Sequence, residues 1–240
     1  MTSMSSANSM STIQCYQSNI VVDFEWTGTP KETWRNGLRQ EIIEVGAVKV
    51  FPDGAVVDTF ARLVCPEIAT AIDPCVRKLT GIQDCDVCEA APFSQVMEEF
   101  FTWIGQGPVR MVAWSDNDQR QFEKECRAKG VEVPSRLRRW MDLQAVYPRV
   151  MGINYKRHLS LEDAAGWYGI EVDSASAHRA LYDARVTSEF LVELLTGGFE
   201  EHRLAMRQAM GRLGSHSCTT NIGSACSALA ELRARLEAAA

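Results

Sequence analysis

The pattern of apolar and polar positions divides the chain into strand-like and helix-like segments. Residues 20–26 (IVVDFEW) are apolar on both faces except for two acids, which is typical of a central strand buried within a sheet. The segments IIEVGAVKVF and AVVDTFARLV flank Pro52-Asp53-Gly54, a turn sequence that predicts a β-hairpin. The polar segment TGTPKETWRNGLRQ between the first strand and this hairpin predicts a surface loop. The sheet is therefore expected to open with three strands in a meander.

Downstream, helical patterns alternate with short apolar segments. Residues 91–105 carry apolar side chains at helical spacing, and residues 115–130 begin with capping-type residues and end on a glycine, so both predict helices. A short helix is expected before Gly81, strands in VRMVAW and over residues 140–143, and helices around 143–150 and 159–168. Ser174 or Ser176 is expected to cap a long helix that runs to about Leu195. These elements predict an α/β fold with a mixed sheet of about five strands flanked by helices on both faces.

The two ends of the chain differ in composition from the middle. Residues 1–17 are polar and lack the basic start and apolar stretch of a signal peptide, so we expect a disordered leader before a domain over residues 18–197. Residues 198–240 are expected to form a flexible linker and a terminal helix, which either mediates self-association as a homodimer or frays. No apolar run approaches the ~20 residues of a membrane span, so no membrane partner is expected.

The net charge and its distribution bear on the choice of partner. A net charge of −6 argues against a protein that coats long duplexes, because such binding depends on cationic side chains. The charge is uneven, however, because six basic residues and one acid lie between Arg136 and Arg157. This basic stripe either guides a short single strand or is an ordinary solvated surface.

The cysteines bear on the cellular compartment and on zinc. Eight cysteines without a secretory signal predict reduced thiols and a cytoplasmic location. Cys85 and Cys88 form a CxxC pair, a spacing found in many zinc sites, but no second pair or close histidine pair completes four ligands. Zinc is therefore disfavoured.

Two acids interrupt the first strand. Asp23 and Glu25 are two residues apart, so both side chains project from the same face of a strand. They are expected near the carboxyl end of the central strand, where open α/β sheets place their ligands. Isolated charges in a buried strand are costly, so these acids require either metals or arginine partners.

Three more residues complete a candidate site. Asp118 lies in the first turn of the helix after VRMVAW, where an acid also serves as a cap; Asp116 is available for that role, which would leave Asp118 free. His178 and Asp183 are five residues apart, or about 140° around a regular helix. Both therefore reach one site only if His178 precedes the helix and Asp183 lies one turn inside it.

Asp23, Glu25, Asp118 and Asp183 would bring four carboxylates into one cleft, where each like-charged pair at ~4 Å costs roughly 4 kcal/mol. Divalent cations remove this repulsion, and a set of oxygen ligands favours two Mg²⁺ or Mn²⁺ ions over zinc. Two such ions activate a water and stabilise the leaving oxygen of a phosphoryl displacement. His178 is the candidate general base, because histidine exchanges protons near neutral pH. The set predicts a phosphodiester hydrolase.

These motifs resemble those of the DEDDh 3′→5′ exonucleases, a DnaQ-like family of the ribonuclease H-like superfamily. DFEWTG is similar to the first motif of that family, WSDND to the second and HRALYDA to the third, and the resemblance covers roughly residues 20–195. It implies a ribonuclease H-like sheet and the release of nucleoside 5′-monophosphates from 3′ ends. It also implies that the four acids are metal ligands and that His178 is the general base.

Within that superfamily, DFE followed by a loop and EIIEVGAV most resembles the enhanced-RNAi-type exoribonucleases and the bacterial sporulation-inhibitor-like relatives. This resemblance favours RNA 3′ ends and implies that Trp26 and Thr27 contact the terminal nucleotide, although Trp26 equally suits a core. It places CDVC in a variable loop. Two departures are that DSASAH lacks the glycine many relatives carry before the histidine, and that Trp26 stands where many have a smaller residue.

Three functions stay open on the sequence alone. The leading one is a metal-dependent 3′→5′ exonuclease on single-stranded RNA, and the second is a DNA 3′→5′ exonuclease of the proofreading or repair type. The third is a regulatory binding protein that retains a nuclease fold. The presence of all five site residues favours an enzyme, because an interaction module does not need the set.

Overall fold

The computed structural model describes residues 16–152, 159–173, 177–200 and 202–203. Its centre is a five-stranded mixed sheet with the strand order β3-β2-β1-β4-β5. The strands are β1 (Ser18–Gly28), β2 (Gln40–Val50), β3 (Val56–Leu63), β4 (Val109–Ala113) and β5 (Trp140–Asp142). β1 is central, and it continues into an antiparallel meander with β2 and β3, as the sequence pattern predicts.

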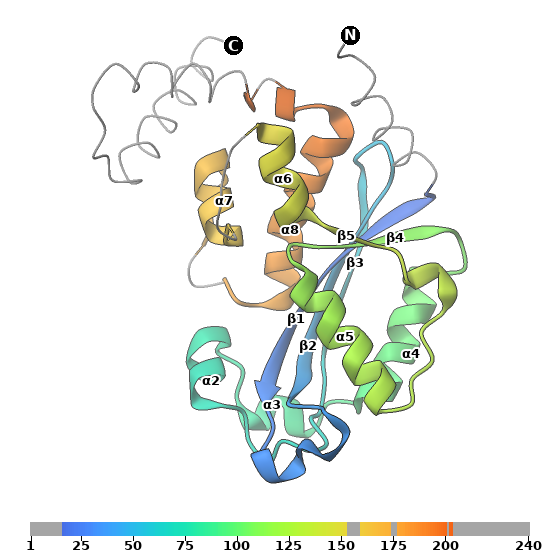
Figure 1. The fold of residues 1–240 in the computed structure, drawn as a ribbon, viewed down its shortest axis with the longest axis vertical. Helices are drawn as coiled ribbons and strands as arrows, with labels where there is room; N and C mark the ends of the chain where they lie inside the picture. The colour runs from blue at the N-terminus through green and yellow to red at the C-terminus, as the bar shows by residue number, and fades with distance from the viewer. Residues whose placement is uncertain (1–15, 153–158, 174–176, 201, 204–240) are drawn as a thin grey trace, which may run out of the picture.

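Helices cover both faces of this sheet (Figure 1). They are α2 (Pro74–Thr80), α3 (Asp84–Cys88), α4 (Phe93–Ile104), α5 (Asp116–Ala128), α6 (Leu143–Met151), α7 (Leu161–Tyr168) and α8 (Ala180–Thr196), with the 3-10 turns η1 (Lys31–Asn36) and η2 (Ser135–Leu137). α4 and α5 pack on one face, and α6, α7 and α8 on the other. α2 and α3 lie at the end of the sheet where β1 ends (Figure 1). The predicted architecture is confirmed.

Alternation along β1 builds a core on each face of the sheet. Ile20 and Phe24 point toward α4 and α5, where the ring of Phe24 stacks on that of Phe122 at a centroid distance of 5.8 Å. Val21 belongs to the core on the opposite face, beneath α6, α7 and α8. The two acids of β1 occupy the same parity as Val21, so they face the α8 side.

The pairing of β1 changes along its length. β4 runs parallel to β1 over residues 18–21 only, whereas β2 follows β1 to its end, with a bulge between Glu25 and Trp26. Beyond Val21, the described residues provide no strand neighbour on the β4 side. The N-terminal turn of α5 approaches β1 there instead, through a hydrogen bond to the strand backbone.

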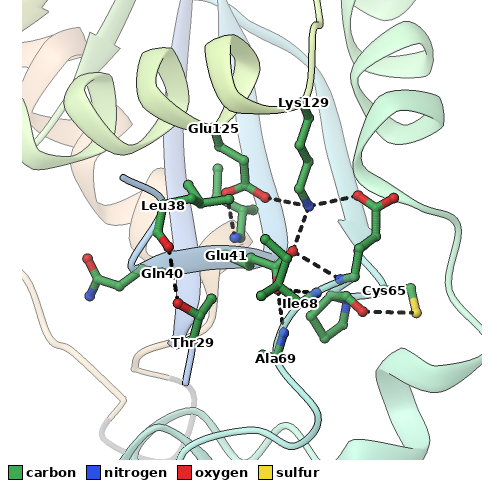
Figure 2. Close-up of polar contacts among 12 residues, drawn as sticks. Thr29, Leu38, Gln40, Glu41, Cys65, Ile68, Ala69, Glu125 and Lys129 are labelled. Atoms are coloured by element: carbon green, nitrogen blue, oxygen red, sulfur yellow. Dashed lines mark hydrogen bonds and ion pairs between the residues drawn. The ribbon is translucent and has the colours of Figure 1, made fainter. Parts of the chain in front are cut away.

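Lys129, which follows α5, gathers three acids into what we call the Lys129 cluster (Figure 2). Its ammonium nitrogen lies 2.8 Å from a carboxylate oxygen of Glu41, 2.9 Å from one of Glu67 and 3.0 Å from one of Glu125. Glu41 also accepts hydrogen bonds from the backbone amides of residues 67–69. The Lys129 cluster therefore fastens the segment after β3 to both α5 and β2.

Two local predictions were wrong. CDVC belongs to the short helix α3 rather than to a loop, because a capping box at its start satisfies backbone groups that a loop would leave open. α8 begins at Ala180 with Arg179 as its N-cap, not after Ser174 or Ser176, and residues 174–176 lie outside the described residues. Residues 177–179, which the structure does describe, are not part of the helix.

The predicted leader and C-terminal extension fall largely outside the described residues, so both stay predictions. After α8, Phe199 is buried and packs against the rings of Tyr147 and Tyr168. In the part of the chain that the structure describes, no helix has the length and apolar character needed to cross a membrane.

Candidate active site

Two carboxylates project from β1 toward α8. Asp23 and Glu25 are at alternate positions in the middle of β1, so the predicted same-face arrangement is present. They lie just past residue 21, where the pairing with β4 stops. β1 itself continues to Gly28, so the acids mark the carboxyl edge of the parallel pairing rather than the end of the strand.

Asp118 joins these acids from the first turn of α5. Ser115 caps this helix with its side chain, and Asp116 forms an ion pair on the helix surface. Asp118 is therefore free of the capping role, as the sequence analysis required. Its carboxylate is buried, and its Oδ1 accepts a hydrogen bond of 3.2 Å from the backbone N–H of Phe24. Because Phe24 separates the two acids of β1, this bond holds Asp118 beside both.

His178 and Asp183 come from the junction between a loop and α8. His178 precedes the helix, and Asp183 lies in its first turn. The backbone of His178 is in the left-handed region, with φ of 63°, and its N–H donates to Oδ2 of Asp183 at 3.2 Å. His178 thus precedes the helix and Asp183 lies one turn inside it, the arrangement that the five-residue spacing requires; a shared catalytic site for the two side chains stays a prediction.

The acids converge on one partly buried group. Carboxylate oxygens of Asp23, Glu25 and Asp183 all lie within 4.8 Å of one another. Burial, followed by the charges of Asp118 and Glu25, raises the pKa of Asp23 well above its ordinary value. Burial and the charge of Asp183 raise the pKa of Glu25 to about 8. Burial also raises the pKa of Asp183, and it raises the pKa of Asp118 to about 7 against the opposing hydrogen bond from Phe24.

The group of four acids carries more negative charge than its surroundings neutralise. Among the described residues, no lysine or arginine forms a salt bridge with any of the four; the nearby Arg179 is paired with Glu44. Buried carboxylates without such partners require either protons or metal ions. Because every donor is an oxygen, the set fits hard divalent cations such as Mg²⁺ or Mn²⁺.

Trp26 and Thr27 follow the two acids on β1. Trp26 is half-buried and packs against the core on the α4–α5 face of the sheet. Thr27 is fully buried, and its Oγ1 accepts a hydrogen bond of 2.8 Å from the backbone N–H of Asp73, the N-cap of α2. Thr27 thus anchors α2 to the end of β1. Contact of either side chain with a terminal nucleotide stays a prediction.

A further acid, which the sequence motifs did not single out, lies beside this group. Glu44 lies on β2 directly opposite Glu25, and its carboxylate forms a 2.6 Å ion pair with Arg179. A signal was present, because IIEVGAV places a single acid inside an apolar strand, where a charge needs a partner. The partner is 135 residues away in sequence, so no local pattern names it.

Two other sequence features take no part in the acidic group. Cys85 and Cys88 are exposed free thiols on α3, and within the described residues the close group of metal-ligand side chains contains no cysteine. In the basic stripe, Arg136 donates to the backbone carbonyl of Gly105 at 2.9 Å, whereas Arg138 and Arg149 are exposed. Residues 156–157 of the stripe lie outside the described residues.

A family model described as an exonuclease (RNase_T) matches residues 20–191, which include all five candidate site residues. The chain belongs to this exonuclease family. The match spans most of the chain, from the start of β1 into the last turns of α8. The resemblance to the DnaQ-like DEDDh 3′→5′ exonucleases is thereby confirmed at the level of the family.

Individual relatives from this exonuclease family extend the picture. The ERI1 exoribonuclease 2 of Danio rerio is 30% identical over 203 residues, which are 75% of this chain but only 35% of that protein. The DNA polymerase III subunit epsilon of Aquifex aeolicus is 28% identical over 178 residues, which are 73% of this chain and 79% of that protein. The chain thus spans about a third of the exoribonuclease.

A solved structure supports the fold. The nuclease domain of 3′hExo, described as a DEDDh family member bound to rAMP, superposes with a TM-score of 0.67 at 23% identity. The match covers 77% of this chain and 94% of that domain. It confirms the ribonuclease H-like fold expected from the sequence.

Proposed function

We propose that this chain is a metal-dependent 3′→5′ exonuclease that releases nucleoside 5′-monophosphates from single-stranded nucleic acid, with RNA favoured over DNA. The observation that carries the proposal is the partly buried group of acids from β1, α5 and α8, with His178 just before the start of α8. An acidic group of this kind has no structural benefit unless cations occupy it. Membership of the exonuclease family supports the same assignment.

The four acids are the proposed metal ligands. Asp23, Glu25 and Asp183 would share two Mg²⁺ or Mn²⁺ ions, and Asp118 would complete the set from α5. When bound, the ions would supply an activated water and stabilise the leaving oxygen of the scissile phosphodiester. β1 contributes two ligands on one face, so a single strand fixes half of the set.

The protein side chains supply the proton transfer and the orientation of the substrate. His178 is exposed beside Asp183, and its imidazole would accept the proton of the attacking water. The water oxygen forms a bond to phosphorus, and the bond between phosphorus and the 3′ oxygen of the preceding nucleotide breaks. The products are a nucleoside 5′-monophosphate and a strand with a new 3′-hydroxyl. Trp26 and Thr27 are proposed to contact the terminal nucleotide.

RNA is favoured by similarity and not by a contact within the site. The Danio rerio relative is named an exoribonuclease, and the 3′hExo nuclease domain was solved with rAMP. DNA is the second candidate substrate, because the Aquifex aeolicus relative, at nearly the same identity, is a DNA polymerase subunit. A regulatory binding role without catalysis is the third candidate, and it predicts that Asp23→Ala retains the biological effect.

The test is a time course with 5′-labelled single-stranded RNA and DNA of one sequence, in Mg²⁺, in Mn²⁺ or with a chelator. A ladder that shortens from the 3′ end, with nucleoside 5′-monophosphate as product, is expected only with metal. Asp23→Ala should abolish the ladder. Asp116→Ala is the matched control, because Asp116 is an acid in the same turn as Asp118 but pairs with Arg120 on the surface.

Each outcome decides between the candidates. A metal-dependent ladder on RNA that is several-fold faster than on DNA supports the full proposal, and the reverse ratio moves the substrate to DNA. Equal activity of wild type and Asp23→Ala would show that the acids of β1 do no chemistry. The absence of any ladder on either strand would favour the binding-protein candidate.

A further inference from the structure

Glu44 is a buried carboxylate that the proposed reaction does not use. It is 4% exposed and lies opposite Glu25, yet it points toward the start of α8 instead of joining the acidic group. Oε2 of Glu44 accepts the backbone N–H of Ala180 at 3.0 Å. Its two oxygens also accept Nε–H of Arg179 at 3.1 Å each, and Oε1 accepts Nη2–H at 2.6 Å.

These bonds leave Glu44 little capacity to act as a further metal ligand. A carboxylate offers about four lone-pair positions, and three N–H donors, one of them shared between both oxygens, take up most of them here. The close group of ligand oxygens accordingly comprises Asp23, Glu25 and Asp183 without Glu44. Glu44 is therefore committed to the N-terminus of α8.

Gly46 adds a second constraint at the same place. It is two residues from Glu44 on β2, opposite Asp23, so it presents the same face of the sheet. A Cβ atom at Gly46 would overlap the backbone nitrogen of Leu181 and the carbonyl carbon of Ala180. The backbone of α8 thus rests directly on the backbone of β2, an approach that only glycine permits.

We propose that Glu44, Gly46 and Arg179, which we call the α8 seat, are positioning residues for the exonuclease reaction. The first turn of α8 carries Asp183, and His178 immediately precedes it. Because the seat fixes that turn against β2, it fixes both groups relative to the acids of β1. Their role in catalysis rests on the proposed function, whereas the placement of the helix by the seat does not.

The first test is Gly46→Ala, which forces the start of α8 away from β2. A displacement of about 1 Å at reacting groups costs on the order of 100-fold in rate, so kcat should fall by about that factor. KM for the oligonucleotide should change by less than about 3-fold, because Gly46 has no side chain with which to contact the substrate. Gly166→Ala on α7 is the matched control, since a Cβ there meets nothing within 4 Å.

The second test is a double-mutant cycle with Glu44→Gln and Arg179→Gln. Glutamine at position 44 retains an oxygen for the N–H of Ala180 but loses the ion pair, so the fold is retained while the seat loosens. Each single variant should lower kcat by roughly 10- to 100-fold, because a loosened start of α8 misplaces Asp183 and His178. The double variant should lose no more than the worse single variant. If the fold-losses in kcat of the two single variants multiply in the double variant, Glu44 acts independently of Arg179, and the proposed α8 seat is overturned.

Hydrogen–deuterium exchange separates this inference from the proposed function. In the metal-free protein, amides of residues 180–183 should exchange at least about 10-fold faster in Gly46→Ala and in Glu44→Gln than in wild type, while those of α5 do not change. Unchanged exchange in both variants overturns the seat, whatever the activity. If the variants exchange faster but the wild-type protein cleaves neither RNA nor DNA, the α8 seat holds as a structural feature and the proposed function is rejected.

Discussion

Two groups of acids in this protein each bring several negative charges together, but only one of them contains a cation that pairs with those charges. In the Lys129 cluster, one ammonium lies within 3.0 Å of three carboxylates (Figure 2). In the group formed by Asp23, Glu25, Asp118 and Asp183, no such ion pair occurs among the described residues. The first group joins the segment after β3 to α5 and β2, and the second lies where β1, α5 and α8 meet.

The difference shows in the protonation of Glu41 and Asp23, although burial outweighs Lys129 at Glu125 and raises the pKa of that acid to about 6. Although burial opposes it, hydrogen bonds from Lys129 and from backbone amides hold the pKa of Glu41 below its ordinary value. Burial and neighbouring carboxylates instead raise the pKa of Asp23 well above its ordinary value. An acid cluster that contains its own cation acts as a framework, whereas one that lacks a cation is suited to bind cations from solution.

Removal of one acid from the uncompensated group should separate activity from stability. Asp23→Asn should lower kcat on the order of 10⁴-fold, or about 5 kcal/mol, as loss of an essential catalytic group does. The same change removes one of four mutually repelling acids, so it should raise the free energy of unfolding of the metal-free protein by about 1 kcal/mol. Urea denaturation with chelator present measures this gain. A loss of stability would contradict the account of the group as uncompensated.

The opposite result is expected when the Lys129 cluster loses its cation. Lys129→Met leaves the buried carboxylates unpaired, so the free energy of unfolding should fall by about 3 kcal/mol. Urea denaturation measures this loss of stability. Lys124→Met on α5 is the control, because Lys124 takes no part in the cluster. Surface substitutions usually change the free energy of unfolding by less than about 0.5 kcal/mol. A change no larger than this would mean that the Lys129 cluster does not stabilise the fold.

Metal ions should stabilise the folded protein by binding to the uncompensated group of acids and not to the Lys129 cluster. At roughly 100 times the dissociation constant, Mg²⁺ or Mn²⁺ should raise the free energy of unfolding by about 2.7 kcal/mol, seen as a higher melting temperature. Asp183→Asn should blunt this response, whereas Lys129→Met should retain it. A wild-type melting temperature that is unchanged across millimolar metal would count against the assembled site.

The smallest expected effect is a pH dependence that arises in the Lys129 cluster. Burial raises the pKa of Glu125 from 4.5 to about 6 on folding, so the folded state binds this proton more tightly than the unfolded chain. Its contribution to stability, at most about 2 kcal/mol, is present below pH 4.5 and is lost as the pH rises through about 6. Glu125→Gln should flatten that fall in urea-denaturation experiments, and the exposed Glu132→Gln should not. An identical slope in Glu125→Gln would refute the assignment.

Local patterns predicted most of the fold and the four acids that come together from β1, α5 and α8; the roles of these acids and of His178 stay predictions. The central strand, the hairpin around Gly54 and the amphipathic helices α4 and α5 each depend on residues close in sequence. The start of α8 was misplaced because the helix begins only after its N-cap Arg179, a boundary fixed by the distant Glu44 and Gly46. Interactions between residues more than 100 positions apart leave only a weak trace, such as one acid in an apolar strand.

The same limit explains why the Lys129 cluster was not foreseen. Glu41 is 88 positions from Lys129 (129 minus 41), and both residues look like ordinary surface residues in sequence. The contact arises from the position of β2 in the sheet, which places Glu41 under the end of α5, beside the buried carboxylate of Glu125. Burial of a charge is a property of the assembled sheet and helix, so no window of sequence contains it.

The hydrogen bond from Phe24 to Asp118 gives the protein a built-in spectroscopic reporter. The N–H of Phe24 points away from β2 into the space beyond β4, and a carboxylate takes the place of a neighbouring strand there. Its amide proton and nitrogen frequencies in a ¹⁵N-resolved NMR spectrum will therefore follow the electronic state of Asp118. This single backbone amide signal would report the binding of metal ions to the acidic group during a metal titration.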